Sequence, residues 1–291
     1  MRTPARMELR GRDGLVTLHS GGIDSGLAIS DGGIEGWYST PDPKVELVER
    51  QSGDGAHAVP DDAVLYAARV ISVGIHAIGG DSGRDATLAL MAELGKLAHQ
   101  NVQARLVDSE GDTFARGFLS VEWDAGARHE EAASGSLTIT CADNRRYSSS
   151  PRTAYLTPSA TDSGGLLYDD GAAYLLSPVQ FGGEAPTSNA CTVSNSGTSA
   201  AYPTITASGS FPRGIRLSGP WGELSYPQAI GSGAPLVLDC LTRTASVLGV
   251  DVTRALSKRD FPAVPAGGSC SINLLASGTG TVAVEVRDTY V

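Results

Sequence analysis

Residues 20–25, Ser-Gly-Gly-Ile-Asp-Ser, are the stretch of this sequence whose residue types and spacing best suit chemistry. They follow an apolar run at residues 15–18, which is typical of a strand. Adjacent glycines leave backbone N–H groups accessible to a phosphate, and a helix that starts just after them would add the positive end of its dipole. Such an arrangement could hold the phosphates of a nucleotide.

The stretch resembles the pyrophosphate-binding loop of the N-type ATP pyrophosphatases, which adenylate carbonyl or carboxylate groups. In that family a long helix follows the loop, and a parallel strand follows the helix. Here the chain instead continues with glycines and then prolines, at positions 26, 32, 33, 36, 41 and 43. Because this density of breakers excludes the helix, we interpret the stretch as a hairpin, two strands joined by a glycine-rich turn.

The histidines show no spacing that indicates a metal site. None has a partner four residues away, and His129-Glu130-Glu131 lacks the second histidine of a metalloprotease helix. A surface or strand-edge position is the interpretation for all five: His19, His57, His76, His99 and His129.

The acidic residues favour turns over binding sites. Asp108, Glu110 and Asp112 surround Gly111, which favours a hairpin turn over a calcium loop, and residues 169–171, Asp-Asp-Gly, are also typical of a turn. Nothing singles out a carboxylate pair for glycoside hydrolysis, and the sequence contains no G-x-S-x-G elbow. We therefore expect no catalytic, cofactor-binding or metal-binding residues, no cofactor and no enzyme activity.

The four cysteines are widely spaced, at Cys141, Cys191, Cys240 and Cys270, without a C-x-x-C pair. Common zinc sites need such pairs, so we expect free thiols that pack as small apolar side chains. The first residues lack the apolar core of a secretory signal, and no run approaches the roughly 18 apolar residues of a membrane helix. We expect a chain folded in a reducing cytoplasm and not inserted in a membrane.

Composition indicates a globular protein with many turns. Of 291 residues, 36 are glycine and 15 proline, which favours short strands over long helices. The formal net charge of −10 argues against specific nucleic-acid binding, because phosphate recognition needs clustered Lys and Arg. The two small basic clusters, Arg145-Arg146 and Lys258-Arg259, are interpreted as solvated turns.

One helix is predicted, over residues 84–99. Ser82 and Asp85 match a capping box, and Leu90, Leu94 and Leu97 recur on one face. A shorter helical turn is expected at 253–258. Period-two or short apolar runs predict strands elsewhere, at 45–50, 69–77, 102–106, 114–123, 137–141, 204–207, 236–241, 243–247, 271–275 and 281–287.

The chain divides into two parts of different composition. Residues 164–291 carry fewer charges than the first half and are richer in Ser, Thr and Gly, and a Ser/Pro/Gly-rich stretch lies between the two parts. We predict a mainly β protein with a first domain of strands and one helix over residues 1–150. A linker follows at 151–163, and a β-sandwich of galectin-like or jelly-roll type occupies 164–291.

Residues 191–207 are informative although they contain no reactive group. The stretch is interpreted as a strand, a turn at Asn195-Ser196-Gly197, a strand start marked by Pro203 and a second strand, together a plain hairpin. We therefore expect this half of the chain to have a structural role and not a catalytic one.

Three segments together resemble the distal tail proteins, also called tail hub or minor tail proteins, of long-tailed bacteriophages. They are residues 66–123, residues 137–147 with an Ala-Asp-Asn exit where the family usually has Ala-Asp-Pro, and residues 191–207 followed by 238–249 and 261–267. As in that family, the chain ends with a strand of alternating valines. The resemblance covers residues 45–291.

The resemblance implies a structural virion protein located at the phage tail tip and assembled in the host cytoplasm. Six copies would form a hub ring whose first domains close a belt around a DNA channel through pairing of edge strands. Partners would be the tail tube protein, the tape measure and the tail-tip or baseplate proteins. Two alternatives remain: a carbohydrate-binding sandwich using Trp221 and Tyr226 for host attachment, and an adenylating enzyme built on residues 20–25.

Overall fold

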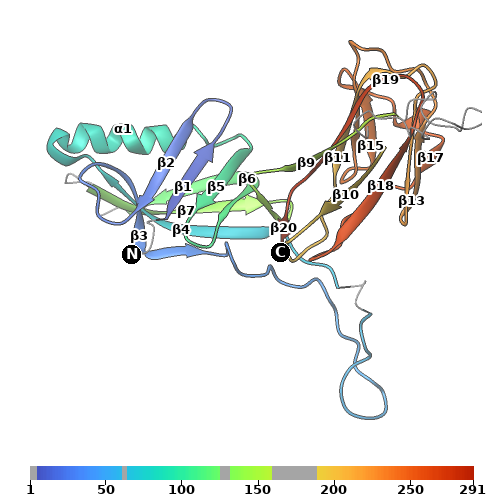
Figure 1. Ribbon diagram of the computed structural model, residues 1–291. Helices are drawn as coiled ribbons and strands as arrows, with labels where there is room; N and C mark the ends of the chain where they lie inside the picture. Colours follow the sequence, from blue (N-terminus) through green and yellow to red (C-terminus); the bar gives the residue numbers. More distant parts are fainter. Residues whose placement is uncertain (1–4, 61–63, 125–131, 159–188) are drawn as a thin grey trace, which may run out of the picture. The chain divides into compact units, whose positions relative to one another are not determined.

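The computed structural model describes residues 5–60, 64–124, 132–158 and 189–291, and they are mainly β. The chain forms two compact units (Figure 1). Unit 1 comprises Met1–Ser150 with Tyr290–Val291, and unit 2 comprises Pro151–Thr289. The mainly β class predicted from the sequence is confirmed. None of the helices in the described part of the chain has the length and apolar character needed to span a membrane.

Seven strands of unit 1 close into a ring, which we call the barrel. Its order is β6-β5-β1-β2-β3-β4-β7, and β7 pairs again with β6. The bounds are β1 Arg6–Arg10, β2 Leu15–Ser20, β3 Gly26–Glu35, β4 Arg69–Ile78, β5 Val102–Val107, β6 Asp112–Trp123 and β7 Ala132–Cys141. Because the ring closes, β4 and β7 are paired along both sides over most of their length.

The barrel interior follows from the period of two in its strands. Ile71, Val73 and Ile75 of β4 are fully buried, as are Leu137 and Ile139 of β7. These alternating apolar residues belong to one hydrophobic cluster that fills the barrel. The strands predicted at 69–77, 102–106, 114–123 and 137–141 are confirmed.

The predicted helix is confirmed, but it is shorter and is capped differently. After a 3₁₀ turn η2 (Gly80–Ser82), α1 runs from Gly83 to Gly95. Ser82 is the N-cap, yet its side chain makes no capping hydrogen bond, so the predicted capping box is wrong. The reason is local geometry, because Ser82 has helical dihedrals where a capping residue needs extended ones.

Residues 39–60 and 64–68 form a long projection between β3 and β4, which we call the arm (Figure 1). The strand expected at 45–50 is wrong, since the described residues of the arm carry isolated bridges in place of a strand, Pro43 with Tyr66 and Glu49 with Ala56. Four backbone hydrogen bonds make these bridges and hold the two legs together: Lys44 N to Leu65 O, Ala67 N to Asp42 O, Arg50 N to Gly55 O and His57 N to Val48 O.

Unit 2 is a sandwich of two antiparallel sheets over one core. The first sheet has the order β10 (Ala190–Ser194), β18 (Ser269–Leu275), β12 (Ile215–Gly219), β13 (Gly222–Tyr226), β17 (Lys258–Arg259). The second is β16 (Val250–Asp251), β15 (Thr244–Val247), β14 (Leu236–Asp239), β11 (Thr204–Ser210), β19 (Thr279–Val286), β9 (Arg152–Leu156). Leu217 and Ile272 of the first sheet and Leu238 and Val284 of the second share one buried cluster. A short 3₁₀ turn, η4 (Thr253–Ala255), lies within the predicted helical turn.

The connection between the units differs from the expected linker at 151–163. Residues 152–156 form β9, an edge strand paired with β19, and residues 159–163 lie outside the described residues. The chain also returns to unit 1 at its end, where β20 (Thr289–Tyr290) lies beside β8 (Arg146–Ser148). Unit 2 is thus an insertion between β8 and the last two residues of the chain.

Residues 191–207 are not a hairpin. β10 pairs with β18 in the five-stranded sheet, whereas β11 pairs with β14 and β19 in the six-stranded sheet. The segment between them therefore crosses from one layer of the sandwich to the other. Local turn chemistry was the basis of the hairpin interpretation, but it does not determine which sheet a strand joins.

Candidate interaction site

The phosphate-loop motif at residues 20–25 joins two neighbouring barrel strands. β2 and β3 are adjacent, as expected, but they pair in parallel, with Leu18 opposite Leu27 and Ser20 opposite Ile29, so the hairpin interpretation is wrong. The short loop turns back on itself, and Gly21 (φ 99°) and Gly26 (φ 119°) supply left-handed backbone for this. A strand follows the loop where a phosphate site would need a helix N-terminus.

The other candidate chemical groups stay apart. His19, His57, His76 and His99 lie on β2, the arm, β4 and the segment after α1, while His129 is outside the described residues. Across the described ranges, groups of three or more His, Cys, Asp or Glu placed to hold a metal are absent. The predicted turn at Asp108 is confirmed, because its Oδ1 accepts the N–H groups of Glu110 and Gly111. Residues 169–171 are outside the described residues.

The cysteines are free and mostly buried, as the sequence predicts. Burial raises the pKa of the Cys141 thiol to about 11 and that of Cys240 still further. Cys270 is also buried, and Cys191 is partly exposed. Burial favours the neutral thiol, so these groups pack as apolar side chains and are poor nucleophiles.

The base of the arm is held by a buried arginine. Arg69 is 1% exposed, and its Nη1 donates to the carbonyl oxygens of Gly36 (2.6 Å), Trp37 (3.0 Å) and Ser39 (2.8 Å). Its Nε donates to the carbonyl of Asn144 at 3.0 Å. Burial and the like charge of Arg146 lower the pKa of Arg69. Arg69 is the residue at which the chain re-enters the barrel after the arm. Its guanidinium therefore fixes the residues at which the chain leaves the barrel to begin the arm.

Aromatic residues complete this base. Trp37 is fully buried, and its indole N–H donates to Thr113 Oγ1. The Tyr38 hydroxyl donates to Asp108, and the guanidinium of Arg146 lies 4.9 Å from the Tyr38 ring and 5.5 Å from the Tyr290 ring. These contacts give the arm a fixed starting point on the barrel.

The arm itself exposes apolar side chains. Leu47 is 62% exposed, Val48 64% and Leu65 63%. Exposed large apolar side chains on a projecting segment make the arm a candidate site for contact with another protein. The tip of the arm is formed by Gly53 (φ 98°) and Gly55 (φ 80°), which explains the Ser-Gly-Asp-Gly sequence there.

A pocket of about 280 Å³ opens at one end of the barrel, and we call it the mouth pocket. The other end lies near the last turn of α1, where Gln100 Oε1 accepts the N–H of Arg12 in the β1–β2 turn at 2.8 Å. The mouth pocket lies at the opposite ends of β1, β2 and β5, and its lining includes Ala5, Ser20, Ile29, Asp31, Tyr38 and Leu106.

The outward face of β4, β7 and β6 carries small hydroxyl side chains, and we call it the hydroxyl face. Ser72 pairs with Thr138, which pairs with Ser120, so three hydroxyls form a row across the strands. The face also carries the charged Glu122 and, further along β6, the exposed Arg116. The exposed apolar side chains Val70 and Phe118 lie on it on either side of Thr140. The other hydroxyl groups of the face belong to Ser134, Ser136 and Thr140.

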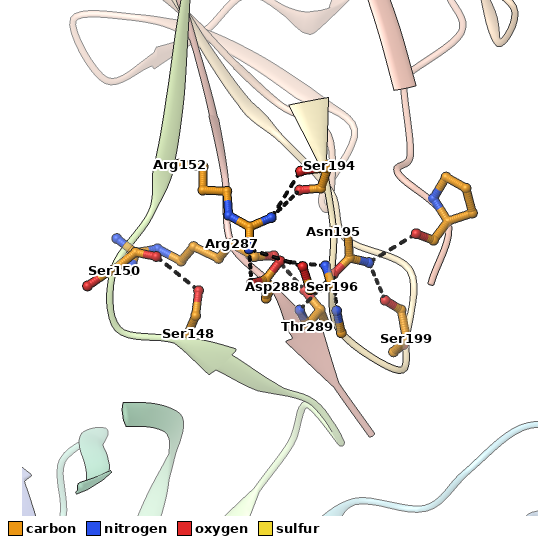
Figure 2. A network of polar contacts seen from close by, with 12 residues as sticks. Ser148, Ser150, Arg152, Ser194, Asn195, Ser196, Ser199, Arg287, Asp288 and Thr289 are labelled. Carbon is orange, nitrogen blue, oxygen red and sulfur yellow. Dashed lines mark hydrogen bonds and ion pairs between the residues drawn. The ribbon is translucent and has the colours of Figure 1, made fainter. Parts of the chain in front are cut away.

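Unit 2 contains a buried amide that we call the Asn195 latch (Figure 2). Asn195 is 1% exposed, its Oδ1 accepts the N–H of Gly197 at 2.9 Å and of Thr289 at 3.2 Å. Its Nδ2 donates to the carbonyls of Ser199, Val264 and Pro265. Every hydrogen-bonding capacity of the amide is used, so the turn residue of the sequence is a structural centre.

Arg152 joins the two sheets at the edge beside this latch (Figure 2). From β9, its guanidinium donates to Ser194 of β10 (3.0 Å to Oγ) and to Ser196 (3.1 Å), and it forms an ion pair with Asp288 at 2.8 Å. Asp288 Oδ1 also accepts the N–H of Ser196 at 2.7 Å. The first and last segments of unit 2 are thereby connected through side chains.

The residues considered for glycan binding are engaged elsewhere. Tyr226 is only 6% exposed and belongs to the core. Trp221 packs partly against the same core, and its indole N–H donates to the carbonyl of Ser271 at 3.2 Å. Tyr226 is thus too buried to stack on a sugar ring, and Trp221 is only partly exposed.

Comparison with solved structures decides the fold. The Dit protein of SPP1, described as a paradigm of the hub adsorption apparatus in phages that infect Gram-positive bacteria, superimposes with a TM-score of 0.62 at 13% identity. The alignment covers 98% of this chain and 99% of that one. The chain has the Dit fold. No protein-family model and no curated protein sequence matches it.

Two further structures with a similar chain are those of the phage P2 baseplate in its activated conformation, with Ca and with Sr. Their TM-scores are 0.53 and 0.51 at 9% identity, and the alignments cover 97% or more of both chains. The similarity to distal tail proteins inferred from the sequence is thus confirmed for the Dit fold of both units.

Sequence reasoning missed the parts of this Dit fold that form the candidate site. Arg69 occupies the same alternating positions of β4 as the buried Ile71 and Val73. An arginine at a position expected to face the core could therefore have indicated the base of the arm. For the arm, the signals were Pro41 and Pro43 at one end and the glycines of the tip. The mouth pocket had no signal, because it depends on closure of the barrel.

Proposed function

We propose that this protein is a non-catalytic structural component of a bacteriophage tail tip, where six copies form a hub ring around a channel for DNA. The observation that carries the proposal is the alignment with the SPP1 Dit protein over 98% of this chain and 99% of that one. Likeness over nearly the full length of both chains favours a shared architectural role over the reuse of one domain.

Contacts between neighbouring copies would form through projecting elements. The resemblance implied pairing of edge strands, but closure of the barrel leaves β4 and β7 paired on both sides. The arm, with its exposed Leu47 and Leu65, is the better candidate. A head-to-tail contact repeated around an axis closes into a ring when the rotation fits.

The hydroxyl face is our candidate for the channel wall. DNA passes a wall without sticking when the wall lacks clustered Lys and Arg, because phosphate contacts dominate nonspecific binding. The hydroxyl row Ser72–Thr138–Ser120 across β4, β7 and β6 and the net charge of −10 both fit this requirement. A ring whose interior proved to be basic would overturn this part of the proposal.

The proposed position of the ring in the phage tail implies which proteins it would contact. The ring would join the tail tube protein on one side to tail-tip or baseplate proteins on the other, with the tape measure protein ending at it. The protein would be assembled in the host cytoplasm and would reside in the virion.

Light scattering on the purified chain, combined with negative-stain images, tests the proposal. A particle of about 180 kDa, six times the 30.0 kDa chain, with sixfold symmetry and a central channel is the expected result. The monomer mass at all concentrations, also after mixing with the tail tube protein and the tail-tip proteins, would contradict it.

A further inference from the structure

We propose that the arm of one copy docks its Leu47–Val48 segment into the mouth pocket of a second copy. This inference rests on the proposed function, because it names the contact that would close the ring. The occupant of the pocket is thus a segment of the same protein in another subunit.

The arm offers a suitable ligand. Leu47 and Val48 are consecutive, more than 60% exposed, and lie on the outgoing leg. Hydrogen bonds between the legs, such as Lys44 N to Leu65 O at 2.6 Å, keep this leg extended. Burial of a leucine side chain contributes about 1.5–3 kcal/mol in a docked state. An isolated subunit leaves this contribution unused.

The pocket offers a suitable receptor. It measures about 280 Å³, and Ile29, Leu106 and Ala5 supply apolar walls between polar groups such as Asp31 at the rim. For comparison, an apolar cavity of about 150 Å³ admits benzene. The mouth pocket thus has room for a leucine side chain together with part of its neighbour.

Geometry favours a second copy over the arm of the same chain. Tyr38 lines the mouth pocket and directly precedes the arm, and Leu47 follows nine residues later, about 30 Å away in an extended chain. A 150-residue unit has a radius of gyration of about 15 Å, so this reach is close to the width of one barrel. The arm would have to fold back on its own base to fill its own pocket, and the hydrogen bonds between its legs oppose that.

Each copy then provides one arm and one pocket at different places on its surface. With such a heterologous contact, a monomer has a free arm and an empty pocket. In a closed ring every arm is docked and every pocket is occupied. The same logic explains why the base of the arm is built on the buried Arg69, because a docking segment must leave the barrel in a defined direction.

Crosslinking of the full-length protein tests the contact directly. Leu47→Cys and Asp31→Cys are made separately in a Cys191→Ser background, mixed and oxidised. A disulfide-linked dimer is expected from the mixture. Leu15→Cys, at the opposite end of β2 and 50% exposed, replaces Asp31→Cys as the control and should give no dimer with Leu47→Cys.

Assembly provides the second readout. Leu47→Asp should weaken self-association at least tenfold and leave the melting temperature of the subunit unchanged, because the residue is exposed in the monomer. Leu248→Asp, at a 72% exposed position in unit 2, is the matched control and should assemble normally.

The outcomes separate the two proposals. A sixfold ring that tolerates Leu47→Asp and gives no 47–31 crosslink overturns the docking contact and leaves the proposed function standing. The contact is also wrong if Leu47→Asp keeps the ring but loses a tail-tip protein, since the arm then binds a different partner. A wild-type chain that never assembles and never crosslinks overturns both.

Discussion

Oδ1 of Asn195 accepts a hydrogen bond from the backbone N–H of Thr289, 3.2 Å away and 94 residues later in the chain. The same oxygen accepts the N–H of Gly197, and both Asn195 and Thr289 are 1% exposed. The crossover between the two sheets of unit 2 is therefore fixed to the strand on which the chain leaves that unit. This relationship makes the latch sensitive to small changes.

Asn195→Ala should destabilise unit 2 by about 3 kcal/mol, because it leaves several buried N–H and C=O groups without partners at about 1–3 kcal/mol for each unsatisfied group. Asn195→Asp keeps the shape and the acceptor but places a carboxylate near three carbonyl oxygens. Its loss of stability should be largest at pH 7 and should shrink below pH 4, where the protonated side chain again donates. Urea unfolding at both pH values measures this, and equal loss at both would contradict it.

Gly197→Ala should also destabilise the latch, since a Cβ there would lie 2.0 Å from the Thr289 carbonyl oxygen. Separation of the backbones would be needed to relieve this contact. Gly231→Ala is the matched control, because its added Cβ meets no atom within 4 Å. The melting temperature should fall for the first variant only, and a similar fall in both would remove the steric explanation.

Arg69→Lys should loosen the base of the arm. A lysine ammonium lacks the planar fork that reaches the carbonyls of Gly36, Ser39 and Asn144 together, and hydrogen bonds from charged groups contribute about 1.5–3 kcal/mol each. Hydrogen exchange should accelerate at residues 36–44 and much less on β7. Arg84→Lys, on the exposed first turn of α1, serves as control. Unchanged protection at the arm base would refute the role of Arg69.

Stability should depend on Asp112 above pH 4. Its hydrogen-bonded ion pair with Arg105 lowers the pKa of the carboxyl group, so the stabilisation is fully present above the unfolded value of about 3.9 and is lost as the pH falls through the folded value. Both side chains are about one-third exposed, which limits the contribution to about 0.2–1 kcal/mol.

Asp112→Asn should accordingly be less stable than the parent at pH 7 and equal to it at pH 2, as measured by urea unfolding. Asp13→Asn provides the comparison, because the Arg12–Asp13 pair is far more exposed and should contribute less. A deficit for Asp112→Asn that persists at pH 2 would point to a cause other than the ion pair.

Thiol labelling at pH 8 should distinguish the cysteines. With a pKa of about 11, Cys141 has about one-thousandth of its thiol ionised, and it is fully buried, so it should react only on unfolding. The partly exposed Cys191 should react first, and Cys191→Ser should remove the fast phase. Rapid modification of Cys141 in the native protein would contradict its burial.

Strands with strict alternation were predictable because their pattern is local. In β7, and in β4 from Ile71 onward, the residues that face the core are apolar or small at every second position, which a sequence window detects without knowledge of the partner strand. The helix was predictable for the same reason. Its end at Gly95 was not, because the apolar residues at 97 and 98 continue the pattern beyond the helix.

Pairing between strands was not predictable from such windows. The parallel register of Leu18 with Leu27 and the assignment of β10 and β11 to different sheets depend on contacts between distant residues. Turn residues such as Gly21 and Asn195 indicated where the chain bends, but not which strand it meets next. The candidate site was the least predictable part of the protein, because the arm, its buried Arg69 and the mouth pocket all arise from tertiary structure.

The insertion of unit 2 between β8 and β20 has a practical consequence for engineering. These two strands are neighbours in the sheet of unit 1, so the chain leaves and rejoins that unit at adjacent points. Any foreign domain whose own ends lie close together can in principle be spliced between Ser150 and Tyr290 without rethreading the barrel. A display scaffold of this type would carry its cargo on a module that is exchanged as one continuous piece of gene.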